Sequence, residues 1–208
     1  IVGLRIDETN AALLAGLARL RASRFERARR MALELERVGI VGSLEGAMAY
    51  ASEHIISRTH FARFLIEQGY ADDMRGVFRK YLVKGKPGYV EHTWAALDEA
   101  LAWIHGAGGT SVIAHPGRYD LGPRLLRELF AEFRDLGGSA VEVVSGSHSQ
   151  DETLRFAQLA REFGLKASRG SDYHGPGHSY VEMGRLAPLP AGCVPLWHDW
   201  PEVLPAAA

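Results

Sequence analysis

Apolar positions follow two different patterns along this chain. Over residues 91–208, short apolar runs rich in β-branched residues alternate with longer segments whose apolar positions recur at helical spacing. The short runs are typical of buried strands and the longer segments of amphipathic helices. This order predicts strands at 110–114, 140–144 and 165–168, and helices at 93–104, 123–136 and 151–163. Strands that alternate with helices favour a parallel sheet or barrel with right-handed crossovers.

The earlier part of the chain is mainly helical. Between a short strand at 1–6 and a short strand at Tyr89–Val90, the pattern indicates only helices. Asn10 is a suitable cap for a long helix from Ala11 to about Val38. Shorter helices are predicted at 43–51, 57–69 and 72–81.

This helical block lies between two strand-bearing flanks, which is the pattern of an inserted subdomain. We predict the insertion at 24–90, and an α/β domain formed by 1–23 together with 91–208. Near the C-terminus, Trp197 and Trp200 are expected to pack the tail onto that domain.

Two predicted strands end in histidine beside glycine and proline. His115 follows strand 110–114, and Asp172 and His174 follow the last strand in a glycine-rich loop. Two side chains that are two residues apart on extended backbone point the same way. Ligand sites of α/β folds gather at the carboxyl ends of strands, and imidazole with carboxylate suits a divalent metal such as Zn or Mn. The alternative is a turn capped by Asp172 and histidines that satisfy local hydrogen bonds.

Other polar residues follow the same strand ends. Arg118 lies three residues after His115, and a guanidinium can bind phosphate through two hydrogen bonds; a surface salt bridge is the alternative. His148 follows strand 140–144 and could contact phosphate or ribose, or could belong to a helix-capping loop. Glu142 is interpreted as a strand residue rather than a ligand, although its neighbours are apolar.

The predicted insertion offers a second group of candidates. Ser57, Arg58 and His60 lie at a helix start, where backbone N–H groups favour anions. Lys84 and Lys86 lie in a glycine-containing loop that could fold over a site. Such a cap would bind a second phosphate, whereas the alternative is an exposed capped helix and a solvated loop.

These motifs occur together in a known family. The chain resembles the PHP (polymerase and histidinol phosphatase) metal-dependent phosphoesterases through the segments 114–118, 170–174, 56–63 and 81–90. Within that family it is most similar to the 3',5'-nucleoside bisphosphate phosphatases, also described as 5'-to-3' exoribonucleases. The resemblance implies an α/β fold, a partial, distorted (β/α)7 PHP barrel with an inserted small helical subdomain.

The resemblance also implies a metal centre and its catalytic residues. His115, Asp172 and His174 would be ligands in a centre of up to three divalent ions. Manganese is the expected metal, with zinc, iron or magnesium as alternatives. Clustered ions can activate water, neutralise phosphoryl oxygens and stabilise the leaving oxygen.

One part of the family pattern does not occur in the chain. The family opens with a His-x-His strand end followed by an Asp, a second His and a Glu, whereas this chain starts at Ile1 directly in an apolar strand. We therefore expect a fragment that lacks its N-terminal portion. Alone, it is expected to be inactive, to bind metal weakly and to aggregate.

The implied function is hydrolysis of the 3'-phosphate of nucleoside 3',5'-bisphosphates, with short RNA as a second substrate processed from its 5' end. The alternatives are a phosphatase for histidinol phosphate or another small metabolite, and a non-catalytic PHP-like module that binds nucleotides or a protein partner. No obligate protein partner is evident.

Composition narrows the remaining possibilities. The formal net charge of -1 gives no global field that would favour nucleic acid. The single Cys193 excludes an internal disulfide and a cysteine-based zinc site, and fits a reducing cytoplasm. No apolar run approaches the length of a membrane span, roughly 18 residues. We expect a cytoplasmic protein that does not associate with membranes.

Overall fold

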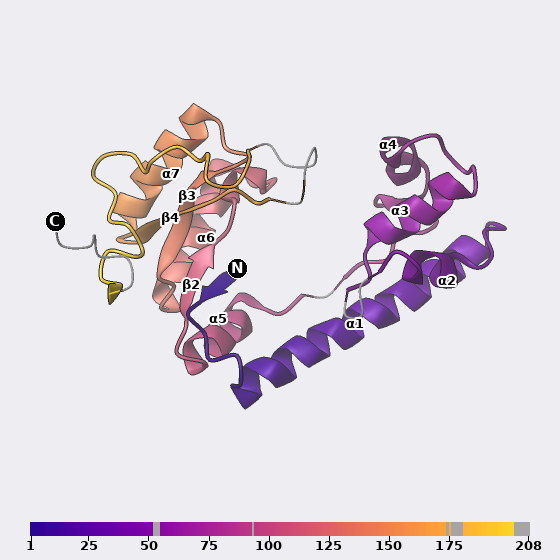
Figure 1. Ribbon diagram of the computed structural model, residues 1–208, viewed down its shortest axis with the longest axis horizontal. Helices are drawn as coiled ribbons and strands as arrows, with labels where there is room; N and C mark the ends of the chain where they lie inside the picture. The colour runs from indigo at the N-terminus through magenta and orange to yellow at the C-terminus, as the bar shows by residue number, and fades with distance from the viewer. Residues whose placement is uncertain (52–54, 93, 174, 176–180, 202–208) are drawn as a thin grey trace. The chain divides into compact units, whose positions relative to one another are not determined.

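The structure is a computed structural model that describes residues 1–51, 55–92, 94–173, 175 and 181–201 (Figure 1). The chain divides into two compact units. We call Ile1–Leu13 with Ala96–Ala208 the sheet unit, and Leu14–Ala95 the helical unit. The insertion predicted at 24–90 lies inside the helical unit.

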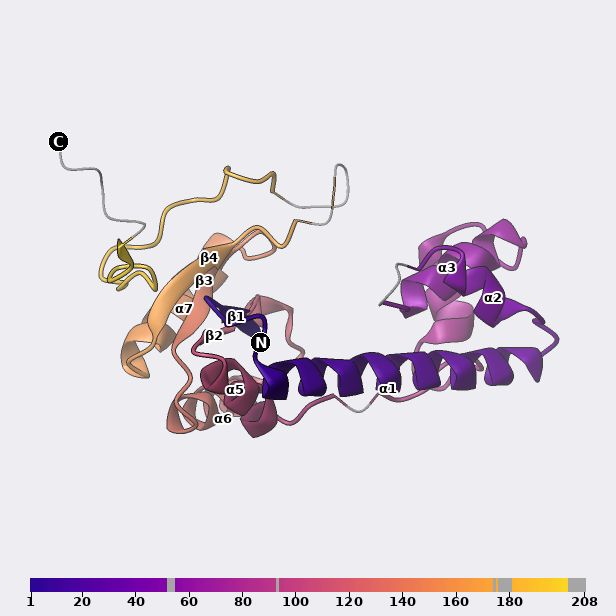
Figure 2. The same cartoon turned by 60° about the horizontal axis from the view of Figure 1, so that its bottom comes forward.

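The sheet unit is built around four strands in the order β1-β2-β3-β4 (Figures 1 and 2). The strands are β1 (Val2–Leu4), β2 (Thr110–Ile113), β3 (Ala140–Ser145) and β4 (Lys166–Gly170). The helices are α5 (Leu97–Gly106), α6 (Pro123–Asp135) and α7 (Gln150–Glu162), with a 3-10 turn, η2, at Pro116–Arg118. This is the predicted alternation of strands and helices.

The strands of the sheet do not all run in the same direction. β2, β3 and β4 are parallel, as the alternation of strands and helices over 91–208 predicts, whereas β1 is antiparallel to β2, with Val2 opposite Val112 and Leu4 opposite Thr110. The sequence pattern sets no direction for the strand at 1–6. A crossover helix forces its two strands to be parallel, but the helical unit separates β1 from β2 and allows either direction. Closure of the sheet into a barrel stays a prediction.

Alternate residues of the strands enter two different cores. Ile113 and Val141 pack with α5, α6 and α7 in a cluster that contains the fully buried Phe130. Val112 and Ala140 point to the other face, where they pack against a C-terminal segment that contributes Leu196, Trp197 and Trp200. The expected packing of the two tryptophans is thus confirmed. Both faces of the sheet are covered, which explains the continuous apolar runs.

The helical unit has its own core. Its elements are α1 (Ala11–Glu36, which begins in the sheet unit), α2 (Ser43–Met48), α3 (Arg58–Glu67), α4 (Met74–Val77) and the π-helical turn η1 (Phe78–Leu82). Asn10 caps α1 as predicted, since its Oδ1 accepts the Leu13 N–H at 3.0 Å. Met31, Leu35 and Phe61 are fully buried at the centre of this core.

The strand predicted at Tyr89–Val90 does not form, since these residues have no regular secondary structure. The apolar signal came from Val90, which is buried in the helical core. Its carbonyl oxygen accepts a hydrogen bond from Arg27 Nε at 2.7 Å, so an arginine rather than a neighbouring strand satisfies the backbone.

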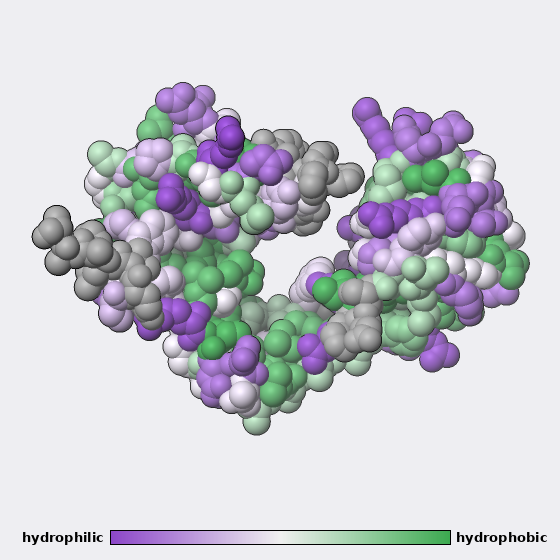
Figure 3. All heavy atoms as spheres, viewed as in Figure 1, coloured by the Kyte–Doolittle hydropathy of each residue, from purple (hydrophilic) through white to green (hydrophobic). Residues whose placement is uncertain are grey.

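The surface of the protein is mixed. Hydrophilic side chains are spread over the visible faces of both units, with hydrophobic side chains exposed between them (Figure 3). Within the described residues, none of the helices combines the length and the apolar composition needed to cross a membrane.

Candidate active site

Two predicted metal ligands lie where strands of the sheet end. His115 follows β2, and Asp172 follows β4. Both adopt a left-handed backbone, with φ of 33° at His115 and 52° at Asp172. Residues other than glycine rarely adopt this conformation, and it costs on the order of 1–3 kcal/mol. The surrounding structure must therefore hold both turns in place.

An ion pair brings the two loops together. Arg118 Nη1 lies 2.7 Å from Asp172 Oδ2, with the two side chains 49% and 23% exposed. The predicted phosphate-binding arginine and a predicted metal ligand therefore lie together at the carboxyl ends of the strands, which we call the sheet edge. A guanidinium in this position can neutralise charge on a phosphate bound beside Asp172.

Several buried polar atoms near these strand ends have no hydrogen-bond partner within the described residues. They are His115 Nδ1, Ser145 Oγ and Ser147 Oγ. Leaving such an atom unpaired costs about 1–3 kcal/mol, which a bound ion or phosphate would offset. The donor set of imidazole nitrogen, carboxylate and hydroxyl fits a divalent metal with a phosphate ligand.

The predicted metal centre is not complete within the described part of the chain. His174, the third predicted ligand, lies outside the described residues. Among the residues that are described, no group of three or more histidine, cysteine or acidic side chains is arranged to hold a metal ion. His115 and Asp172 are the part of the predicted ligand set that the structure describes.

His148 lies at the same edge, with both ring nitrogens bonded to backbone groups. Its Nε2 accepts the Gly117 N–H at 3.1 Å, and its Nδ1 lies 3.1 Å from the Val143 carbonyl oxygen. Burial lowers the pKa of His148, which favours the neutral ring that this pattern requires. A Cβ on Gly117 would approach a ring carbon of His148 to 2.8 Å, so glycine permits the contact. A substrate contact by His148 stays a prediction. Such a contact would replace the bond to the Gly117 N–H or the bond to the Val143 carbonyl oxygen.

Glu142 is a strand residue, as predicted, but its contact with His115 was not predicted from the sequence. Its Oε2 accepts the backbone N–H of His115 at 2.6 Å. Burial raises the pKa of its carboxyl group. The sequence did contain a signal, because Glu142 is the one charged residue in the apolar run Ala140–Val144, and a buried carboxylate needs a specific partner.

In the helical unit, the predicted helix start is confirmed. Ser57 is the N-cap of α3, and its N–H donates to His60 Nδ1 at 3.2 Å. The guanidinium of Arg58 lies over the Phe78 ring, 5.7 Å from its centroid. His60 therefore has a capping role, and its pKa is lowered first by burial and then by Arg63.

The start of α3 contributes to a small basic cavity. Its lining is Arg24, Arg27, Ala28, Met31, Ile56, Ser57, Arg58 and Phe61, with no carboxylate among the described lining residues. The pKa of Arg27 is lowered, first by burial and then by the positive charge of Arg58. Arginines that repel one another in this way favour an anion nearby, although the cavity itself, about 10 Å³, has room for about one water molecule.

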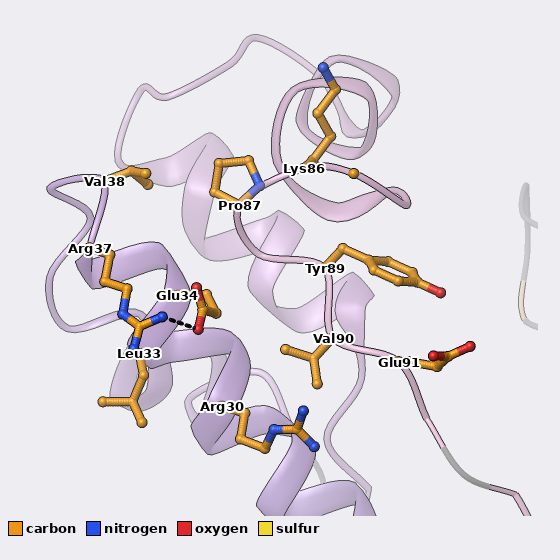
Figure 4. A pocket seen from close by; sticks show the side chains of 11 residues that line it. Arg30, Leu33, Glu34, Arg37, Val38, Lys86, Pro87, Tyr89, Val90 and Glu91 are labelled. Carbon is orange, nitrogen blue, oxygen red and sulfur yellow. Dashed lines mark hydrogen bonds and ion pairs between the residues drawn. The ribbon is translucent and has the colours of Figure 1, made fainter.

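Lys86 lines two other cavities of the helical unit. One, of about 860 Å³, includes Arg30, Glu34, Arg37, Tyr89 and Glu91 in its lining (Figure 4). The other, of about 680 Å³, includes Asp72 and Asp73. The Lys86 side chain points away from Tyr89 in Figure 4. The structure groups Ser57 with Arg58, and places Lys86 in a mixed, partly acidic surrounding.

No protein-family model matches the chain, but individual proteins do. A 3',5'-nucleoside bisphosphate phosphatase of Chromobacterium violaceum is 52% identical over 96% of this chain and 70% of its own length. The 5'-3' exoribonuclease Rnm of Escherichia coli is 44% identical over 96% of this chain and 68% of its own length.

Two solved structures share the fold. A protein from Chromobacterium violaceum, described as an amidohydrolase with bound sulfate and no metal, aligns with a TM-score of 0.84 and 52% identity. The alignment covers 95% of this chain and 69% of that one. A protein from Bifidobacterium adolescentis, assigned as a metal-dependent phosphoesterase, aligns with a TM-score of 0.68 and 25% identity, over 83% of this chain and 61% of that one.

The α/β fold, the ligand-type side chains at the strand ends and these similarities define a hydrolase of the metal-dependent phosphoesterase class. The chain belongs to the PHP-type family that includes 3',5'-nucleoside bisphosphate phosphatase and the 5'-3' exoribonuclease Rnm.

Proposed function

We propose that this protein removes the 3'-phosphate of nucleoside 3',5'-bisphosphates, and that it also shortens small RNA molecules from the 5' end. The observation that carries the proposal is the sheet edge, where Arg118 is paired with Asp172 at 2.7 Å and His115 Nδ1 is buried without a partner in the described residues. The names of the relatives from Chromobacterium violaceum and Escherichia coli support the two substrate classes.

His115, Asp172 and His174 are the residues that would hold the metal. Manganese is the proposed ion, with zinc, iron or magnesium as alternatives and up to three ions in the complete centre. Bound divalent ions supply an activated water and polarise the phosphoryl oxygens. Arg118 would orient the phosphate through paired N–H donors and neutralise its negative charge.

The helical unit would bind the phosphate that is not hydrolysed. Arg58 is the central residue, and Arg24 and Arg27 line the same cavity and add positive charge. Ser57 contributes the N-terminus of α3, whose backbone N–H groups favour an anion. Lys86 and His148 remain candidate substrate contacts.

The free, partly buried Cys193 is consistent with a reducing cytoplasm.

Two other functions fit the same fold. A phosphatase for histidinol phosphate would use the sheet edge without needing the basic cavity. A non-catalytic module that binds nucleotides or a protein would use the basic cavity without chemistry at the sheet edge.

A phosphate-release assay separates these functions. The purified full-length protein, supplied with manganese, is compared on an adenosine 3',5'-bisphosphate, an adenosine 5'-monophosphate and histidinol phosphate. The proposal predicts the highest kcat/KM for the bisphosphate, with release of the 3'-phosphate. Preference for histidinol phosphate, or no release from any of the three substrates, would overturn it.

A further inference from the structure

The carboxylate of Glu142 is directed at the backbone of His115 and not at its ring. Its Oε2 accepts the His115 N–H at 2.6 Å, a short distance that is typical of a charge-assisted hydrogen bond. We propose that Glu142 is a positioning residue, which holds the turn at His115 in the conformation that presents the imidazole to the metal centre. This inference rests on the proposed role of His115 as a metal ligand.

The turn at His115 needs such support. With φ of 33° and ψ of 54°, His115 has a left-handed backbone that a histidine adopts at a cost in conformational free energy. Tyr119 restrains one side of the turn, because its hydroxyl donates to the Ala114 carbonyl oxygen at 2.7 Å. Glu142 restrains the other side by accepting the N–H of His115, which follows Ala114 in the chain. The two bonds together fix the peptide group that joins β2 to the loop.

The sheet is built to admit this carboxylate. The register between β3 and β4 shifts between Glu142 and Val144, and bulges of this kind redirect side chains near functional sites. On β4, a Cβ at Gly170 would lie 2.5 Å from Glu142 Oε1, so a residue larger than glycine would displace the carboxylate. An acidic side chain within a buried apolar strand is unfavourable unless it has a defined partner. Here the defined partner in the described residues is the N–H of His115.

This arrangement resembles the second layer of residues that orients ligands in metal sites generally. Such partners commonly change metal affinity about 10- to 100-fold when they are removed. The expected signature is a loss of metal affinity together with a change at the His115 amide, without loss of the fold.

The first measurement observes the hydrogen bond directly. In protein labelled with 15N-histidine, His115→Ala identifies the His115 amide signal by its disappearance. A short bond to a carboxylate moves an amide proton strongly downfield. Glu142→Leu is expected to shift this signal upfield, whereas Glu142→Gln, which keeps an acceptor oxygen, is expected to shift it only partly. An unchanged His115 signal in Glu142→Leu would overturn the proposal.

The second measurement is the affinity of the full-length protein for manganese, determined by calorimetry. Glu142→Leu should weaken binding about 10- to 100-fold, and Glu142→Gln should retain binding within a few-fold of wild type. Equal losses in the Leu and Gln variants, with the His115 amide signal of Glu142→Gln preserved, would show that Glu142 is itself a metal ligand and would contradict a positioning role.

Asp73 supplies the matched control. Its Oδ1 also accepts a backbone N–H at 2.6 Å, from Gly76, but it caps α4 in the helical unit. Asp73→Leu should lower stability without changing manganese affinity. If Asp73→Leu and Glu142→Leu weakened manganese binding equally, the effect would be general destabilisation and the proposal would fail. If His115→Ala leaves manganese binding unchanged, the metal-ligand assignment fails independently of the Glu142–His115 bond.

Discussion

The two units use charge in opposite ways. In the sheet unit, charged groups at the strand ends have specific partners: Arg118 pairs with Asp172, and Glu142 accepts the His115 N–H. In the helical unit, Arg24, Arg27 and Arg58 line one small cavity with no acidic residue among its described lining. The first arrangement fixes individual atoms, whereas the second creates a region of positive potential.

Under the proposed function, this difference gives each unit a different role. Hydrolysis needs ligand atoms held at defined positions, and strand ends of a covered sheet provide such positions. Recognition of a phosphate that does not react needs mainly positive charge and N–H donors, which arginines at a helix start provide. Substitutions in the two units should therefore differ in kind as well as in size.

The largest expected effect concerns the separate cores. Phe130 and Phe61 are both fully buried, in the sheet unit and the helical unit respectively. Truncation of either to alanine should cost about 3–5 kcal/mol of stability, because it removes apolar contacts and leaves a cavity. Hydrogen exchange measured by mass spectrometry should show faster exchange mainly in the unit that carries the substitution. Equal loss of protection in both units would show that the two cores unfold as one.

A smaller effect is expected for recognition of the substrate. Arg58→Ala should lower kcat/KM for the bisphosphate, because a charged hydrogen-bond donor is lost. The expected loss corresponds to about 2 kcal/mol of transition-state stabilisation. The loss for a nucleoside 3'-monophosphate, which lacks the second phosphate, should be much smaller. Arg63→Ala is the control, because it removes an exposed arginine from the same helix. It should leave kcat/KM unchanged for both substrates. Equal losses on both substrates in Arg58→Ala would assign Arg58 a structural role.

The smallest expected effect is on the pH dependence of folding stability. Burial lowers the pKa of His148 in the folded protein, so the unfolded chain binds its proton first as the pH falls. The stabilising contribution of neutral His148 is present above the unfolded pKa of about 6.5 and declines as the pH falls toward the lower folded value.

Urea denaturation of metal-free protein at pH 7.5 and pH 5.5 measures this contribution. His148→Asn should lose less stability between the two pH values than wild type does, because the titrating group is absent. Identical losses in the two proteins would show that His148 is protonated equally in the folded and unfolded states.

Much of the fold could be predicted because local patterns decide it. The apolar runs of β2, β3 and β4, the cap at Asn10 and the helix start at Ser57 depend on neighbouring residues in the sequence, and all are present. The antiparallel β1 could not be predicted, because its direction depends on a strand about a hundred residues away.

The site was only partly predictable for the same reason. Residue types identified His115, Asp172 and Arg118, but the Arg118–Asp172 pair joins loops that are distant in sequence. The left-handed turn at His115 and its bond to Glu142 depend on tertiary contacts that no local pattern records. Arg24 and Arg27 line a cavity with Arg58 only because α1 and the start of α3 pack together, which no local pattern records.

The most direct test of the account is the metal content of the Asp172→Ala variant of the full-length protein, measured together with its hydrolysis of the bisphosphate. Asp172 lies at the strand end, paired with Arg118, and is proposed to provide a carboxylate ligand. The account predicts that the variant binds less metal than wild type and releases no measurable phosphate, while its circular dichroism spectrum is unchanged. Unchanged metal content with an unchanged rate of phosphate release would contradict the proposal that this sheet edge is the metal-dependent active site.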